Sequence, residues 1–259
     1  MKERPAISYE THGSGPDLVL FHGGFGCRKH WSRNIAPLSK HFRVHALDHP
    51  GYGESAGVSS DMTGLEYLDF FYAQLLEIFP GDAPLRFAGF SFGGGISTNM
   101  AARLGKRVSH LCLISPAGSK KRNYAGRPTR SYKEAGDDEA ELRKICRHNL
   151  LINMLSYPKT ITEETLDIQV YCVRNTKFNS RKVSGGETLL PDLGNLKCKL
   201  RLLWGEGDDS KYRPADQLIG DIAEAAGGTL DIHRVPKAGH WAAYENAAAV
   251  NDLMVDFFS

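Results

Sequence analysis

The sequence lacks the features that mark several large classes of protein. It has no run approaching the roughly 20 apolar residues of a membrane span, no internal repeat and no low-complexity segment. Its 32 Lys and Arg nearly balance its 30 Asp and Glu, so a net charge of +2 gives no reason to expect a nucleic-acid or membrane partner. Residues 1–7 carry no apolar stretch of the kind that a secretory leader needs.

Cysteine is scarce, and its five residues form no C-x-x-C pair. An odd number of widely spaced thiols is typical of a protein from a reducing compartment, so we expect free thiols, no metal site and a cytoplasmic location. Cys27 has no evident partner that would activate it, and we interpret it as structural. The others are Cys112, Cys146, Cys172 and Cys198.

Short apolar runs alternate with longer helical patterns along most of the chain. This alternation predicts an α/β fold, with a mostly parallel central sheet and helices on both faces. Most of the runs are continuously apolar, as strands buried on two faces should be. The expected strands are 7–11, 18–21, 44–47, 85–88, 110–114, 200–204 and 230–235.

Helices are expected between these strands, and one of them shows clear boundaries. Asp61 is expected to cap the helix at 62–79, and Pro80 to end it. The other expected helices of the repeating pattern are 30–40, 93–106, 214–226 and 242–258.

The alternation stops between residues 117 and 198, where we predict helices at about 134–155 and 162–178 and no strand. We interpret this insertion segment as a helical cap over one edge of the sheet, because loops at the carboxyl ends of parallel strands often take that place. The expected domains are therefore a core, residues 1–116 and 199–259, and a cap, residues 117–198.

The most informative motif of the chain is Gly89-x-Ser91-x-Gly93, which lies between an expected strand and an expected helix. This is the pattern of a nucleophile elbow, in which the two glycines leave room for a sharp turn and the serine hydroxyl stands at its tip. The helix that begins here also favours negative charge developing near Ser91.

A serine nucleophile needs a base and an acid that orients the base, and candidates for both follow expected strands. Asp208 comes directly after the strand at 200–204, and its neighbour Asp209 is a possible substitute. His240 follows the last strand, and Gly239 allows the loop to turn. The order Ser91, Asp208, His240 is the one expected of α/β-hydrolases.

The oxyanion of a tetrahedral intermediate needs N–H donors. One is expected from the backbone of Phe92, directly after the serine. The other is expected from the loop Phe21-His-Gly-Gly-Phe-Gly26, in which Gly24 is our candidate.

Together these motifs resemble the α/β-hydrolase superfamily over everything except the insertion segment. The turn Asp48-His-Pro-Gly-Tyr-Gly-Glu-Ser55 is also similar to a D-x-P-G-x-G-x-S turn of that family. The resemblance implies an acyl-type intermediate on the serine, a pocket shaped by the cap, a small-molecule substrate and no cofactor.

Different motifs of this sequence resemble two different branches of the superfamily. His22-Gly-Gly24, residues 30–38, Ile161-Thr-Glu-Glu164 and Gly239-His-Trp-Ala-Ala-Tyr-Glu245 look like carbon–carbon bond hydrolases that act on ring-fission (meta-cleavage) products. Those enzymes usually carry Asn where this chain has Phe90, and a cap arginine where it has Gln169. The run Gly89-Phe-Ser-Phe-Gly-Gly-Gly95 instead resembles esterases and cofactor-free haloperoxidases.

The nucleophile is expected to have apolar surroundings, contributed by Phe25, Phe90, Phe92 and Trp241. A basic run at the start of the insertion segment would suit a carboxylate on the substrate, but a solvated face explains those charges equally well. The run comprises Lys120, Lys121, Arg122, Arg127, Arg130 and Lys133.

We therefore expect a serine hydrolase that cleaves a small, largely apolar ester, with carbon–carbon hydrolysis of a diketo acid as the alternative. Dehalogenases and epoxide hydrolases on this fold use Asp in the place of Ser91, which argues against those activities. A ligand receptor with little turnover is the alternative of a different class. The pattern leaves the oligomeric state open between monomer and homodimer.

Overall fold

A computed structural model describes residues 6–119, 128–186, 188–210, 214–228 and 230–259 of the chain. Its centre is a seven-stranded sheet of order β1-β3-β2-β4-β5-β6-β7, in which β1 pairs antiparallel with β3 and all other pairs are parallel. The α/β class and the mostly parallel sheet are thus confirmed. The strands are β1 (Ser8–His12), β2 (Asp17–Phe21), β3 (Arg43–Asp48), β4 (Leu85–Phe90), β5 (Val108–Ile114), β6 (Lys199–Gly205) and β7 (Leu230–Val235).

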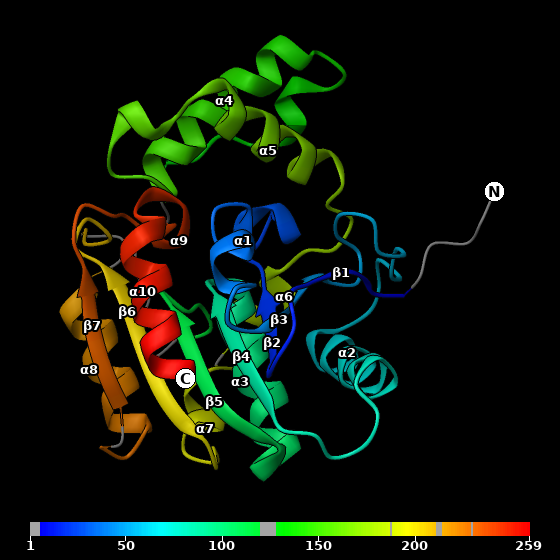
Figure 1. Cartoon of the computed structure of the whole chain (residues 1–259). Coiled ribbons are helices and arrows are strands. Elements are labelled where there is room, and N and C mark those ends of the chain that lie inside the picture. Colours follow the sequence, from blue (N-terminus) through cyan, green and yellow to red (C-terminus); the bar gives the residue numbers. More distant parts are fainter. Residues whose placement is uncertain (1–5, 120–127, 187, 211–213, 229) are drawn as a thin grey trace.

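Helices cover both faces of the sheet (Figure 1). Along β2, Leu18 and Leu20 face one hydrophobic cluster while Val19 and Phe21 face the other, so the strand is buried on both sides. The first cluster includes side chains of α10 (Ala247–Phe258), and α1 (Ile35–Leu38) packs against this helix. The second includes α2 (Gly64–Ile78), α3 (Phe92–Leu104), α7 (Leu190–Leu193) and α8 (Ala215–Ala225).

Several helices differ from their expected bounds. The expected helix at 30–40 is wrong: a 3-10 turn, η1 (Arg28–Trp31), precedes the four-residue α1. Pro37 lacks the N–H that a continuous helix would use there. The helix α2 is capped by Thr63, which forms a capping box with Glu66, and not by Asp61 as expected.

The expected last helix, 242–258, is divided into α9 (Ala242–Glu245) and α10, and the side chain of Asn246 caps the second part. A short 3-10 turn, η2 (Gly105–Arg107), follows α3.

The insertion segment contains α4 (Glu139–Asn153) and α5 (Glu163–Arg174), which lie above the carboxyl edge of the sheet in Figure 1. Gly136, with a positive φ of 50°, separates α4 from the preceding turn, so the expected helix at 134–155 begins later. In the described residues of this segment there is no strand. The shorter elements are η3 (Tyr132–Ala135), η4 (Pro158–Thr160) and α6 (Arg181–Ser184).

The two ends of the insertion segment pack differently. Side chains of α4 and α5 join the hydrophobic cluster that includes α10. From Phe178 onward the segment returns along the core, where α6 packs on α2 and α7 packs on α3 and α8. The division into a core and a cap at residues 117 and 198 stays a prediction. Within the described parts of the chain, no helix has the length and apolar character needed to cross a membrane.

Candidate active site

Ser91 occupies a strained turn between β4 and α3. Its φ of 51° and ψ of −114° lie outside the regions that non-glycine residues usually adopt. A Cβ at Gly89 would overlap the Ser97 hydroxyl, and one at Gly93 would overlap the backbone of Phe21, so the turn requires glycine at both positions. The elbow therefore places the Ser91 hydroxyl at the carboxyl end of a central strand.

The side chain of His240 lies between Ser91 and Asp208. Its Nε2 is 2.9 Å from the Ser91 Oγ, and its Nδ1 is 2.8 Å from Oδ2 of Asp208. Asp208 and His240 are each only 3% exposed. A neutral imidazole that donates from Nδ1 to the carboxylate leaves Nε2 to accept the serine proton.

The neighbouring carboxylate, Asp209, lies elsewhere. Its Oδ1 accepts a hydrogen bond from the backbone N–H of Ala215 at the start of α8, at 3.0 Å. The indole Nε1 of Trp204 donates to the Asp208 carbonyl at 2.9 Å and helps to fix this loop. Of the two candidate acids, Asp208 is the one in contact with His240.

Glu245 supports the loop that carries His240 and was not singled out from the sequence as a site residue. Its carboxylate accepts hydrogen bonds from the backbone N–H of Gly239 at 2.6 Å, of Ser156 at 3.0 Å and of Tyr157 at 2.7 Å. The last two residues belong to the insertion segment. Glu245 therefore ties that segment to the residue that precedes His240.

The two expected oxyanion donors lie near each other. Phe92 is the first residue of α3, where a backbone N–H has no partner within the helix. A Cβ placed on Gly24 would lie 3.8 Å from the Phe92 Cβ and 3.0 Å from the Ser180 hydroxyl. Two residues before Ser180, the Phe178 carbonyl accepts a hydrogen bond from the buried Tyr52 hydroxyl at 3.1 Å, so the insertion segment is held against the core near this position.

A buried network fixes the start of the oxyanion loop, which we define as residues 23–27. His22 donates from Nδ1 to the Gly23 carbonyl at 2.8 Å, and its Nε2 accepts the His49 N–H at 3.0 Å. Its ring stacks on His49 with 3.7 Å between centroids. Burial lowers the pKa of His22 to about 3, so this ring is neutral in its structural role.

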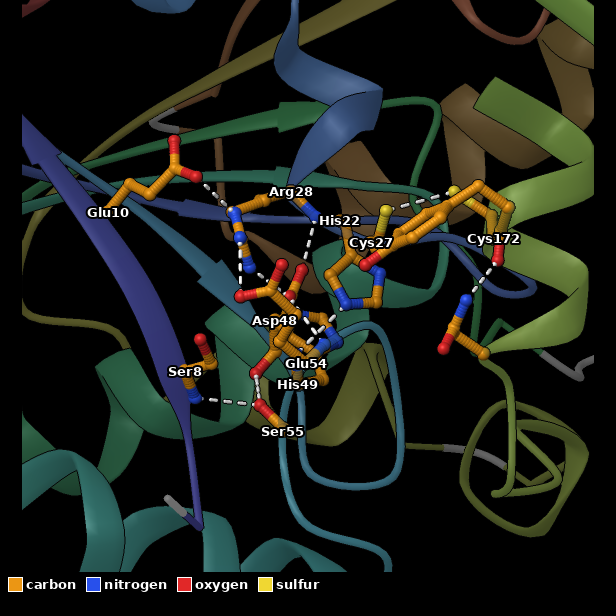
Figure 2. A network of polar contacts seen from close by, with 12 residues as sticks. Ser8, Glu10, His22, Cys27, Arg28, Asp48, His49, Glu54, Ser55 and Cys172 are labelled. Carbon is orange, nitrogen blue, oxygen red and sulfur yellow. Dashed lines mark hydrogen bonds and ion pairs between the residues drawn. The ribbon is translucent and has the colours of Figure 1, made fainter. Parts of the chain in front are cut away.

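Asp48 fixes the other end of this loop (Figure 2). Its carboxylate accepts the backbone N–H of Arg28 at 2.7 Å and of Glu54 at 2.9 Å, and it also forms an ion pair with the Arg28 guanidinium. Ser55 donates to the Asp48 carbonyl at 2.6 Å. The D-x-P-G-x-G-x-S turn thus anchors the chain directly after the oxyanion loop.

The expected pocket residues take different positions. The ring of Phe90 is buried, with its centroid 5.2 Å from that of His240. Phe25 is 43% exposed at the tip of the oxyanion loop. Trp241 is fully buried, stacks on Tyr244 and donates to the His30 carbonyl at 3.0 Å, so it packs in the core beside the site.

The basic run falls mostly outside the described residues, which exclude Lys120, Lys121, Arg122 and Arg127. Arg130 forms ion pairs with Glu134 and Glu141, so its charge is already matched. Within the described residues, no group of three or more His, Cys, Asp or Glu side chains is arranged to hold a metal ion.

A sequence model of the alpha/beta hydrolase fold family matches residues 16–138. The chain has the α/β-hydrolase fold. A 2-hydroxy-6-oxononadienedioate/2-hydroxy-6-oxononatrienedioate hydrolase from Comamonas testosteroni is 27% identical over all of this chain and 94% of its own length. A pimeloyl-[acyl-carrier protein] methyl ester esterase from Vibrio vulnificus is 37% identical, over 42% of this chain and 40% of its own length.

Solved structures of a hydrolase and a putative esterase show the same fold. A meta-cleavage product hydrolase from Pseudomonas fluorescens superposes with a TM-score of 0.75 at 22% identity, over 97% of this chain and 93% of its own. A putative aryl esterase from Burkholderia cenocepacia gives a TM-score of 0.80 at 19% identity, over 97% and 93%. With hydrolases among its full-length relatives, this α/β-hydrolase is an enzyme.

Proposed function

We propose that this α/β-hydrolase cleaves small, largely apolar esters, with Ser91, His240 and Asp208 as its catalytic triad. The observation that carries the proposal is the continuous chain of hydrogen bonds from Asp208 through His240 to Ser91. It joins three residues that are distant in sequence and follow three different strands, in the order of charge stabiliser, base and nucleophile.

In this mechanism, the Ser91 Oγ attacks the ester carbonyl while its proton passes to Nε2 of His240. The Asp208 carboxylate stabilises the imidazolium that forms, and the N–H groups of Gly24 and Phe92 hold the oxyanion. His240 then gives its proton to the leaving alkoxide, which departs as the alcohol. Water, deprotonated by the same histidine, releases the acid and restores the Ser91 hydroxyl.

The apolar character of the substrate is inferred from the side chains next to the nucleophile. The Phe90 ring lies beside both His240 and His30, and its edge fills the space next to Gly23. Helices α4 and α5 would act as the cap over this site. Placement of the site at the carboxyl edge of the sheet supports that arrangement, because ligands of open α/β sheets bind there.

Hydrolysis of a carbon–carbon bond is the second candidate. It is favoured by two relatives that are 27% identical over 100% and 97% of this chain. The first is the hydrolase from Comamonas testosteroni described above, and the second is named 2-hydroxy-6-oxo-6-phenylhexa-2,4-dienoate hydrolase. The same serine, histidine and oxyanion donors would serve it. Against it stand Phe90 and Gln169, in the places where the resembled enzymes usually have Asn and Arg.

The test compares p-nitrophenyl esters of graded chain length with a dienoic ring-fission product. We expect the higher kcat/KM with a short or medium-chain ester, and complete loss of turnover and of fluorophosphonate labelling in Ser91→Ala. A preference of several orders of magnitude for the dienoic acid would establish the second candidate. Binding of small apolar acids by a wild-type protein that neither labels nor turns over would indicate a receptor.

A further inference from the structure

The oxyanion loop, residues 23–27, is held at both of its ends by the core. Its start is fixed at Gly23, whose carbonyl accepts from His22 and whose N–H donates to Nδ1 of His30 at 3.3 Å. Its end is fixed by the hydrogen bond from the Arg28 N–H to Asp48. Neither anchor reaches the middle of the loop, where Gly24 and Phe25 lie.

The middle of the loop is strained at Phe25, which has a φ of 48°. This left-handed conformation disfavours residues that carry a Cβ, and Phe gains none of the local hydrogen bonds that allow Asn or Asp to adopt it. Such a conformation persists only where the surrounding structure enforces it. Because the loop is held at both ends, a change of backbone conformation at Phe25 has to be compensated at the neighbouring Gly24, whose N–H is the proposed oxyanion donor.

The insertion segment supplies a contact that can enforce it. The side-chain Nε2 of Gln169, on α5, donates to the Phe25 carbonyl at 3.3 Å, and Gln169 is only 3% exposed. The Tyr132 ring packs on the Phe25 ring with 5.0 Å between centroids. The insertion segment therefore contacts both the carbonyl and the ring of Phe25.

A second contact comes from the same face of α5. Cys172 lies three residues after Gln169, and therefore close to it on the helix surface. Its Sγ is 3.0 Å from the Sγ of Cys27, the last residue of the loop, and both thiols are fully buried (Figure 2). The helix therefore meets the oxyanion loop at Phe25 and again at Cys27.

We propose that Gln169 is a positioning residue, which holds Phe25 in its left-handed conformation and so keeps the Gly24 N–H directed at the oxyanion. This inference rests on the proposed function, because it assumes that the Gly24 N–H stabilises a tetrahedral intermediate. Gln169 does not touch the reacting atoms. Its Nε2 donates to the loop, so Gln169 takes a structural part where the resembled carbon–carbon hydrolases usually carry an arginine.

The test is Gln169→Leu, which keeps the approximate size of the side chain and removes the donor. We expect a fall of about tenfold in kcat for a p-nitrophenyl ester with KM changed less than twofold, because an oxyanion contact acts in the transition state. Fluorophosphonate labelling should slow by a similar factor. Amide hydrogen exchange of a peptide that covers residues 23–27 should become at least several-fold faster.

The matched control is Gln74→Leu, on the exposed side of α2, where the glutamine Nε2 donates to Glu77 at the same distance of 3.3 Å. This variant should leave both kcat and exchange in the oxyanion loop unchanged. A further variant separates positioning from general packing: Phe25→Gly permits the left-handed conformation without strain. In that background, Gln169→Leu should reduce kcat by clearly less than tenfold.

Each outcome decides a separate point. An unchanged kcat in a folded Gln169→Leu protein, or an equal loss in the Phe25→Gly background, would overturn the positioning role. If Gln169→Leu fails to fold, Gln169→Glu replaces it as the test variant. An ionised carboxylate cannot donate to the Phe25 carbonyl, so this variant should also lower kcat at neutral pH. An inactive wild type would refute the proposed function instead, and loop exchange in the same variants would still show whether Gln169 holds Phe25.

Discussion

The carboxylates of Asp208 and Asp209 are adjacent in sequence and serve different elements: the first contacts His240 and the second accepts the N–H of Ala215. One therefore belongs to the proposed triad, and the other holds the first residue of α8. The two positions provide matched variants, in which the same chemical change is made one residue apart.

Asp208→Asn should lower kcat by about 10³- to 10⁴-fold, since an amide in this place favours the wrong tautomer of the histidine. Asp209→Asn should leave kcat within about threefold and change the stability little, because the amide oxygen can still accept the Ala215 N–H and Asn caps helices about as well as Asp. Ester kinetics and thermal unfolding of both variants check the assignment. The reverse pattern of kcat losses would move the acid to Asp209.

The small space between Gly24 and Ser180 leads to a prediction of rescue. A Cβ at Gly24 would lie 3.0 Å from the Ser180 Oγ but 3.6 Å from its Cβ. Gly24→Ala alone should therefore lower kcat by about tenfold or more, because the loop shifts and an oxyanion donor is misplaced. Adding Ser180→Ala removes the close oxygen and should restore part of that loss. A double variant no more active than Gly24→Ala would show that the close contact is not the cause.

The thiol pair of Cys27 and Cys172 predicts a definite titration result. All five cysteines are free, so denatured protein kept from reductant should show five reactive thiols. In the native protein, Cys112 and Cys172 should react slowly, because burial raises the pKa of Cys112 to about 12 and that of Cys172 well above its usual range. A count of three reactive thiols in denaturant, restored to five by reductant, would reveal a disulfide, and the 3.0 Å separation of Cys27 and Cys172 makes this pair the expected one.

An acid-sensitive contribution to stability is expected at Asp17, the first residue of β2, at the opposite end of the parallel strands from the site. Hydrogen bonds from Arg43 lower the pKa of its carboxyl, with a further contribution from His45, while burial acts in the opposite direction. Because the folded-state pKa is depressed, this stability is present above about pH 4, the unfolded value, and is lost as pH falls through the folded value.

Asp17→Asn should therefore lower the melting temperature at pH 7 and reduce its fall between about pH 4 and pH 2. Asp69→Asn is the control, because its ion pair with Arg103 is exposed and worth little. Equal effects of the two substitutions at pH 7 would argue against a special role for Asp17.

The sequence predicts most of the sheet because burial on two faces leaves a local signal. The continuous apolar run of β2 and the glycines around Ser91 can each be interpreted within a few residues. The helix expected at 30–40 fails although Pro37 is a local signal against a continuous helix, and a distant contact that the sequence does not show lies in the same stretch. Asn34 there donates to Asn251 of α10, and a contact over such a separation leaves no local pattern.

The support of the candidate site is non-local in the same way. Gln169 lies 144 positions from Phe25, and Glu245 lies 89 positions from Ser156. In the sequence, Gln169 stands out only because the resembled carbon–carbon hydrolases usually have arginine there. Glu245 is only one residue of a stretch that resembles the same enzymes. Neither pattern contains the hydrogen bond that gives the residue its place.

The contacts of Ser180, Gln169 and Cys172 with residues 24, 25 and 27 have a consequence for protein engineering. An insertion that touches the oxyanion loop at these positions is not an interchangeable part. Chimeras that graft the corresponding segment of a relative onto this core should need loop residues from the same donor. In evolution, substitutions in the insertion segment should likewise be accompanied by substitutions in the oxyanion loop, so that substrate specificity and reaction rate change together.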